Sequence, residues 1–163
     1  MFNNKILTST IILTLLTLTI TVNIQQTISC SCALPESAIT ALNKSTVVFS
    51  GKAIKVKYID PQTQDSPEPR IIVTFKVDQV WKGKVGKTFE IQTVFNKWTC
   101  RGFFFAEGNE YLVFSYLRKN DPSEYPNFDK KYSNIYDVSL CSGTNLLSQS
   151  KSFLEELGKG KSP

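Results

Sequence analysis

Ile71-Ile72-Val73-Thr74-Phe75-Lys76-Val77-Asp78 is the stretch that decides the fold class of this chain. Apolar side chains stand at every second position from Ile71 to Val77, and Thr74, Lys76 and Asp78 stand between them. Such alternation is typical of a β-strand that buries one face and exposes the other. We therefore predict a half-buried strand here. A polar loop over Asp60–Pro69 precedes it, and a turn over Trp81–Gly86 follows it.

Similar patterns on both sides of this strand predict the rest of the fold. Four further strands are expected over Thr46–Ile59, Phe89–Phe95, Glu110–Arg118 and Tyr132–Val138. Gly51 interrupts the first of them and is expected to mark a bulge or a bend.

Two short helices are expected at the ends of the domain. The first covers Pro35–Asn43, with Pro35 in its first turn and Ala38, Ile39 and Leu42 as its apolar face. The second is indicated by apolar residues at helical spacing between Leu146 and Leu157, and Gly158 is its natural stop. Five strands, two flanking helices and no βαβ alternation predict an all-β protein, and a five-stranded OB-fold barrel fits best.

The N-terminal segment has the layout of a secretory signal peptide. Lys5 is its charged residue, Ile11–Val22 is its apolar region, and Thr27-Ile28-Ser29 offers small residues before a cleavage site. We expect residues 1–29 to be removed, residues 30–158 to form one domain, and residues 159–163 to form a disordered tail. The protein is accordingly expected to be secreted and extracellular.

Two alternatives remain for this segment. Ile6–Ile24 is almost long enough to be a transmembrane anchor, although threonines interrupt it. A lipoprotein signal would place a lipid on the sulfur of Cys30 and anchor the protein at the cell surface, but Thr27 is a poor match for that signal.

Cysteine usage and charge limit the possible functions. Four cysteines in an exported chain predict two disulfides with three possible pairings, and their spacing is unlike a C-x-x-C zinc site. The chain contains no histidine, and no pairing of its scattered carboxylates is evident, so we do not expect an enzyme. The net charge of +5 comes from scattered lysines and arginines, which does not predict nucleic-acid binding.

The mature chain resembles the tissue inhibitors of metalloproteinases, within the wider netrin-like family. The match begins at Cys30-Ser31-Cys32-Ala33-Leu34-Pro35, and this C-x-C start is its most specific part. It continues through Val80-Trp81-Lys82-Gly83, Cys100 with Gly102-Phe103, the segment from Gly108 to Phe114, and Cys141 followed by the amphipathic helix.

The resemblance implies a binding mechanism. It implies the disulfides Cys30–Cys100 and Cys32–Cys141. It also implies that the α-amine and carbonyl oxygen of Cys30 displace the water from the zinc of a target protease. The amine must be neutral to bind zinc, and the reference pKa of an α-amine is about 7.7–8.0. The partner would be a zinc metalloprotease, and the protein itself would be a monomer without a cofactor.

The resemblance also assigns contacts around Cys30. Ser31 would enter the first primed pocket of the protease, and Ala33 and Leu34 would extend along its cleft like substrate. Trp98 and Thr99 would form a second contact loop. The Asp60–Pro69 loop would correspond to the family's variable hairpin loop between the first two strands, which can touch the protease. Animal members carry six cysteines in this domain and a further cysteine-rich domain, whereas this sequence has four cysteines and no such addition. The alternative is a secreted netrin-like binding module without inhibitory activity.

Overall fold

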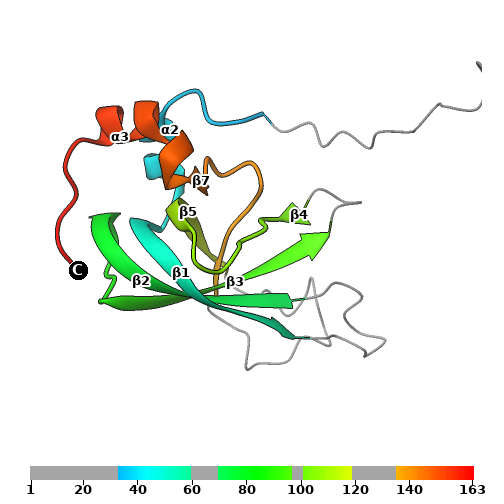
Figure 1. The fold of residues 1–163 in the computed structure, drawn as a ribbon. Helices are drawn as coiled ribbons and strands as arrows, with labels where there is room; N and C mark the ends of the chain where they lie inside the picture. Colours follow the sequence, from blue (N-terminus) through cyan, green and yellow to red (C-terminus); the bar gives the residue numbers. More distant parts are fainter. Residues whose placement is uncertain (1–32, 60–69, 97–100, 119–134) are drawn as a thin grey trace, which may run out of the picture.

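The computed structural model describes residues 33–59, 70–96, 101–118 and 135–163 (Figure 1). Within them the chain forms seven strands and three short helical segments. The strands are β1 Val47–Ile59, β2 Arg70–Lys82, β3 Thr88–Asn96, β4 Arg101–Gly102, β5 Glu110–Arg118, β6 Ile135–Asp137 and β7 Asn145–Leu146. The helical segments are α2 Ala38–Lys44, the 3₁₀ turn η2 Leu147–Gln149 and α3 Lys151–Leu157.

The strands form one antiparallel sheet that curls into a barrel. Their order is β4-β3-β2-β1-β5-β6, and β7 pairs with β5. The two ends of the sheet approach each other, because the rings of Phe89 on β3 and Tyr136 on β6 lie 4.9 Å apart. The hydroxyl of Thr93 on β3 donates a hydrogen bond of 3.1 Å to the carbonyl of Val138, just beyond β6. These contacts confirm the expected all-β barrel with flanking helices.

The core follows from the alternation in β2 and its neighbours. Ile71, Val73, Phe75 and Val77 are all buried, as predicted. The ring of Phe75 makes edge contacts with Phe49 and Phe105, each with centroids 5.3 Å apart. Aromatic side chains therefore occupy the centre of the barrel.

Gly51 allows β1 to bend around this core. The pairing of β1 with β2 shifts register between Ser50 and Gly51, which confirms the predicted bulge. A Cβ atom at Gly51 would lie 2.6 Å from the carbonyl oxygen of Lys76, so no larger residue fits without a shift of the backbone. Glycine is therefore required by the close approach of two strands.

Both helices cover the outer face of β1 and β5 (Figure 1). A second buried cluster forms there from Ala41, Val48, Leu112 and Phe114, with apolar residues of α3 packed against it. The backbone N–H of Ala38 donates a 2.8 Å hydrogen bond to Oε2 of Glu156, which joins the start of α2 to α3. Among the described residues, no helix is long and apolar enough to span a bilayer.

The helix boundaries differ from those expected. Ser37 caps α2, since its hydroxyl accepts a hydrogen bond from the N–H of Thr40, so Pro35 lies before the helix and not in its first turn. Ile39 was expected on the apolar face, but its side chain is 46% exposed and Ala41 is buried instead. The second helix is split into η2 and α3, and Gly158 ends it as predicted.

The structure also differs from the sequence-based expectation around Trp81 and after Gly158. β2 continues through Trp81 to Lys82, and the turn starts only at Gly83. Lys161, expected in a disordered tail, exchanges two backbone hydrogen bonds of 2.8 and 2.9 Å with Val80. The indole of Trp81 donates a further bond to the carbonyl of Gly158. The C-terminal residues thus cover the part of the β2 edge that β3 leaves free.

Candidate functional site

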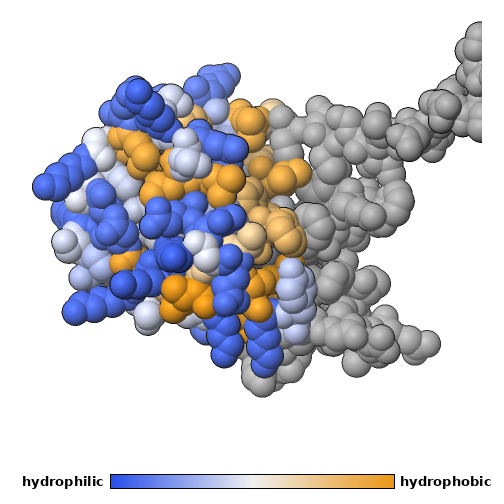
Figure 2. Space-filling model, in the orientation of Figure 1, coloured by the Kyte–Doolittle hydropathy of each residue, from blue (hydrophilic) through white to orange (hydrophobic). Residues whose placement is uncertain are grey.

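The start of the described chain lies beside Cys141 at one end of the molecule. Ala33, Leu34, Pro35 and Cys141 line the same hollow, of about 440 Å³. Leu34 is 65% exposed, more than any other large apolar side chain among the described residues. In Figure 2 hydrophilic residues cover much of the visible face, and apolar residues gather beneath the helices at the top and again in the lower part of the face. An exposed apolar residue at the rim of a hollow is available for contact with another protein.

The loop that carries Cys141 is held from both sides. The N–H of Phe114 on β5 donates to the hydroxyl of Thr144, a buried residue, over 2.9 Å. Gly143 has a φ of +91°, and a Cβ atom there would lie 3.1 Å from the ring of Phe153 and 3.4 Å from Pro35. The position of Cys141 relative to Pro35 is therefore set by close packing.

Cys141 itself is disulfide-bonded. The other three cysteines, Cys30, Cys32 and Cys100, lie outside the described residues, as do Ser31, Trp98, Thr99 and the Asp60–Pro69 loop. The expected leader over residues 1–29 also lies outside them. Of the predicted site residues, the structure therefore places two expected contact residues, Ala33 and Leu34, and one expected disulfide residue, Cys141, and all three line the same hollow.

The first prediction concerns the pairing of the cysteines. The resemblance implies Cys32–Cys141 and Cys30–Cys100, and Ala33, which directly follows Cys32 in the sequence, borders the same hollow as Cys141. Peptide mapping of the secreted protein without reduction should recover these two bridges. Recovery of a Cys30–Cys32 bridge, or of any free thiol, would contradict the pairing.

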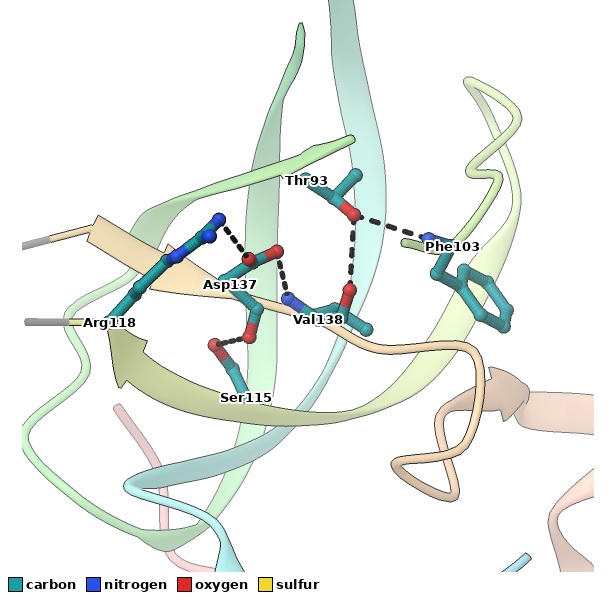
Figure 3. Close-up of polar contacts among 6 residues, drawn as sticks. All are labelled: Thr93, Phe103, Ser115, Arg118, Asp137 and Val138. Atoms are coloured by element: carbon teal, nitrogen blue, oxygen red, sulfur yellow. Dashed lines mark hydrogen bonds and ion pairs between the residues drawn. The ribbon is translucent and has the colours of Figure 1, made fainter. Parts of the chain in front are cut away.

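A buried polar junction lies where β3 meets the residues that follow β4 and β6 (Figure 3). Thr93 is 1% exposed, and its hydroxyl donates to the carbonyl of Val138 and accepts a 3.2 Å hydrogen bond from the N–H of Phe103. It therefore connects β3 with the segment after β4 and with the segment after β6. Thr93 is not among the site residues predicted from the sequence. The sequence does contain an indication of it. Thr93 continues the alternating series Phe89, Ile91, Thr93, which places its hydroxyl on the inward face of the strand, where a hydroxyl needs hydrogen-bond partners.

A second polar group lies beside this junction (Figure 3). Asp137 is buried, and its carboxylate lies 3.5 Å from the guanidinium of Arg118 and accepts a bond from the N–H of Val138. The hydroxyl of Ser115 donates to the backbone carbonyl of Asp137 over 2.9 Å. Because the carboxylate is paired and hydrogen-bonded, Asp137 fixes β6 against β5 and is satisfied in its buried position.

The described residues offer no metal site of their own. No group of three or more cysteine, aspartate or glutamate side chains within them is arranged to hold a metal ion. The resemblance places the zinc in the target protease. No family model and no curated protein matches this chain. The functional assignment therefore depends on the residues and their arrangement.

Proposed function

We propose that this protein is a secreted inhibitor of zinc metalloproteases that binds the catalytic zinc through the α-amine and carbonyl oxygen of Cys30. The observation that carries the proposal is the position of Ala33 and Leu34. These residues follow the C-x-C motif directly, are exposed, and border the hollow of the disulfide-bonded Cys141. The barrel thus holds Ala33 and Leu34, the two apolar residues that follow the motif, in an exposed position.

Zinc chemistry explains why such a terminus would inhibit. A catalytic zinc keeps three protein ligands and one position for water, which a neutral amine and a carbonyl oxygen can occupy together. A free peptide would lose conformational entropy on chelation. A terminus held by two bridges loses less, so more of the interaction energy remains as affinity. Ser31 would then enter the first primed pocket, with Ala33, Leu34, Trp98 and Thr99 as further contacts.

The experiment that tests this proposal begins with the exported protein. Its N-terminal mass should show that the mature chain starts at Cys30 with a free amine and no lipid. This protein should inhibit members of a panel of secreted zinc metalloproteases, and it should not inhibit serine proteases, which have no zinc to chelate. Absence of inhibition across the panel would favour the alternative, a netrin-like binding module.

A second prediction concerns Ser31. Its short side chain fills a deep hydrophobic pocket poorly, so Ser31→Leu should strengthen inhibition of proteases with deep primed pockets and weaken it for those with shallow ones. One methylene group more or less in a hydrophobic pocket changes recognition by about 10- to 200-fold, so Ser31→Leu should change affinity by at least about 10-fold. Inhibition constants across the panel measure this change, and thermal unfolding should be nearly unaltered. Equal changes for all proteases, or a large loss of stability, would contradict the assignment.

A further inference from the structure

We infer that Thr93 is a positioning residue whose hydroxyl fixes the spacing between the two chain segments that carry the partners of the N-terminal bridges. This inference rests on the proposed function and on the predicted pairing of the cysteines. It concerns a residue buried inside the barrel, which touches neither the protease nor the zinc.

The geometry of the junction is the first step. Phe103, whose N–H donates to Thr93, follows Cys100 by three residues, and Val138, whose carbonyl accepts from Thr93, precedes Cys141 by three residues. One hydroxyl therefore lies between the segment after Cys100 and the segment before Cys141. If Cys30 and Cys32 are bridged to these two cysteines, this hydroxyl helps to set the distance between their anchors.

The segments that contain Phe103 and Val138 are each held in place by contacts of their own. The Thr93 hydroxyl therefore connects two well-packed segments. The ring of Phe103 lies 4.6 Å from that of Phe105, which is fully buried in the core. On the other side, the carboxylate of Asp137, next to Val138, pairs with the guanidinium of Arg118. β4 pairs with β3 over only two residue pairs, Phe95 with Gly102 and Asn96 with Arg101. The Thr93 hydroxyl extends this short pairing to Phe103.

The choice of threonine at this position supports the role. Its neighbours along the inward face of β3, Phe89 and Ile91, are apolar and pack in the core. A hydroxyl inside a barrel is tolerated only when its hydrogen bonds are made, and Thr93 makes one as donor and one as acceptor. Valine would fill nearly the same space and would make neither bond.

Three variants separate positioning from plain stability. Thr93→Val removes both hydrogen bonds, and Thr93→Ser retains the hydroxyl while losing the methyl group. Ser115→Ala is the matched control, because it removes another buried hydroxyl that donates to a backbone carbonyl near β6 without touching the Cys100 segment. Circular dichroism at the assay temperature establishes that each variant is folded.

The readout is the preference of the protein for a zinc-loaded protease over the same protease depleted of zinc, because only chelation depends on the metal. A misplacement of about 1 Å can cost on the order of 100-fold when geometry is critical, so Thr93→Val should lose about 10-fold or more of this preference. Thr93→Ser and Ser115→Ala should keep a preference close to that of the native protein. In the native protein, the amide of Phe103 should exchange its hydrogen slowly.

Each contrary result has a distinct meaning. The inference is overturned if Thr93→Val prefers the zinc-loaded protease as strongly as the native protein does. It is also overturned if Thr93→Val and Ser115→Ala lose this preference equally, because Thr93 would then have a purely structural role. If Thr93→Val does not fold, loss of preference in Thr93→Ser, or fast exchange at Phe103 in the native protein, overturns it instead. If the native protein inhibits no protease, the proposed function fails, and the positioning role fails with it.

Discussion

Blocking the α-amine of Cys30 is expected to abolish inhibition while leaving the fold unchanged. Acetylation makes the nitrogen lone pair unavailable and adds bulk at the metal. An alanine placed before Cys30 turns the amine into an amide and moves the new terminus by about 3.3–3.6 Å. A zinc–nitrogen bond measures about 2.0–2.1 Å, so the displaced amine is out of reach. The inhibition constants of the blocked forms should rise by about 100-fold or more.

The measurement compares native, acetylated and alanine-extended protein on the protease that the native form inhibits best. An alanine added after Pro163 is the matched control, because the nearby Lys161 pairs with β2 and does not line the hollow of Cys141. Circular dichroism should be the same for all forms. Inhibition that survives in both blocked forms would show that the chelation mechanism is wrong.

The pH dependence follows from the same chemistry. Only the neutral amine binds zinc, and a free α-amine has a reference pKa of about 7.7–8.0. Inhibition should therefore strengthen as pH rises toward this range and weaken as pH falls below it. The acetylated protein should lack this dependence, because it has no titrating amine.

The barrel could be predicted from the sequence because its strands are long and half-buried. Glu110–Arg118 was predicted with the bounds that β5 has, and the alternation around Phe75 identified the buried face of β2. β4 and β7 were missed because two residues each are too few to show a period of two. Short strands of this kind are specified by their neighbours in the fold.

At the C-terminal residues, composition predicts a disordered tail, whereas the structure shows a segment that pairs with β2. Gly158-Lys159-Gly160-Lys161 has the glycine and charge content of a flexible tail. The structure uses the glycine for a close approach, since a Cβ atom at Gly160 would lie 2.9 Å from the Cβ of Gln79. A local pattern cannot reveal this use because β2, the contacting strand, lies about half the chain away.

The candidate site was predictable only in part, for two physical reasons. The C-x-C motif and the apolar residues Ala33 and Leu34 that follow it can be read from the sequence. The structure adds that Ala33 and Leu34 are exposed and line the same hollow as Cys141. The pairing of four cysteines cannot be deduced from spacing. The role of Thr93 depends on Phe103 and Val138, which the barrel brings to it from different strands. Hydrogen bonds between distant segments leave no periodic signal.

Phe75→Ala is expected to cause a large loss of stability. Phe75 is fully buried, and its ring contacts those of Phe49, Phe105 and Tyr111. Replacing a buried phenylalanine by alanine costs about 3–5 kcal/mol, because apolar contacts are lost and a cavity remains. Small domains have about 5–15 kcal/mol of total stability, so a large share is removed. The melting temperature should fall by roughly 10 °C or more.

Phe104→Ala is the matched control, since it removes the same side chain from a position that is 50% exposed, and its effect should be much smaller. Denaturant unfolding at one temperature measures both free energies. The cluster around Phe75 lies inside the barrel, whereas Ala33 and Leu34 line a hollow beside α2 and Cys141. At a temperature where Phe75→Ala is still folded, it should therefore inhibit as the native protein does. Equal stability losses for the two variants would mean that the aromatic cluster is not the centre of the core. A loss of inhibition in the folded Phe75→Ala protein would mean that the packing of the barrel and the geometry of the N-terminus are coupled more tightly than their separation in the structure implies.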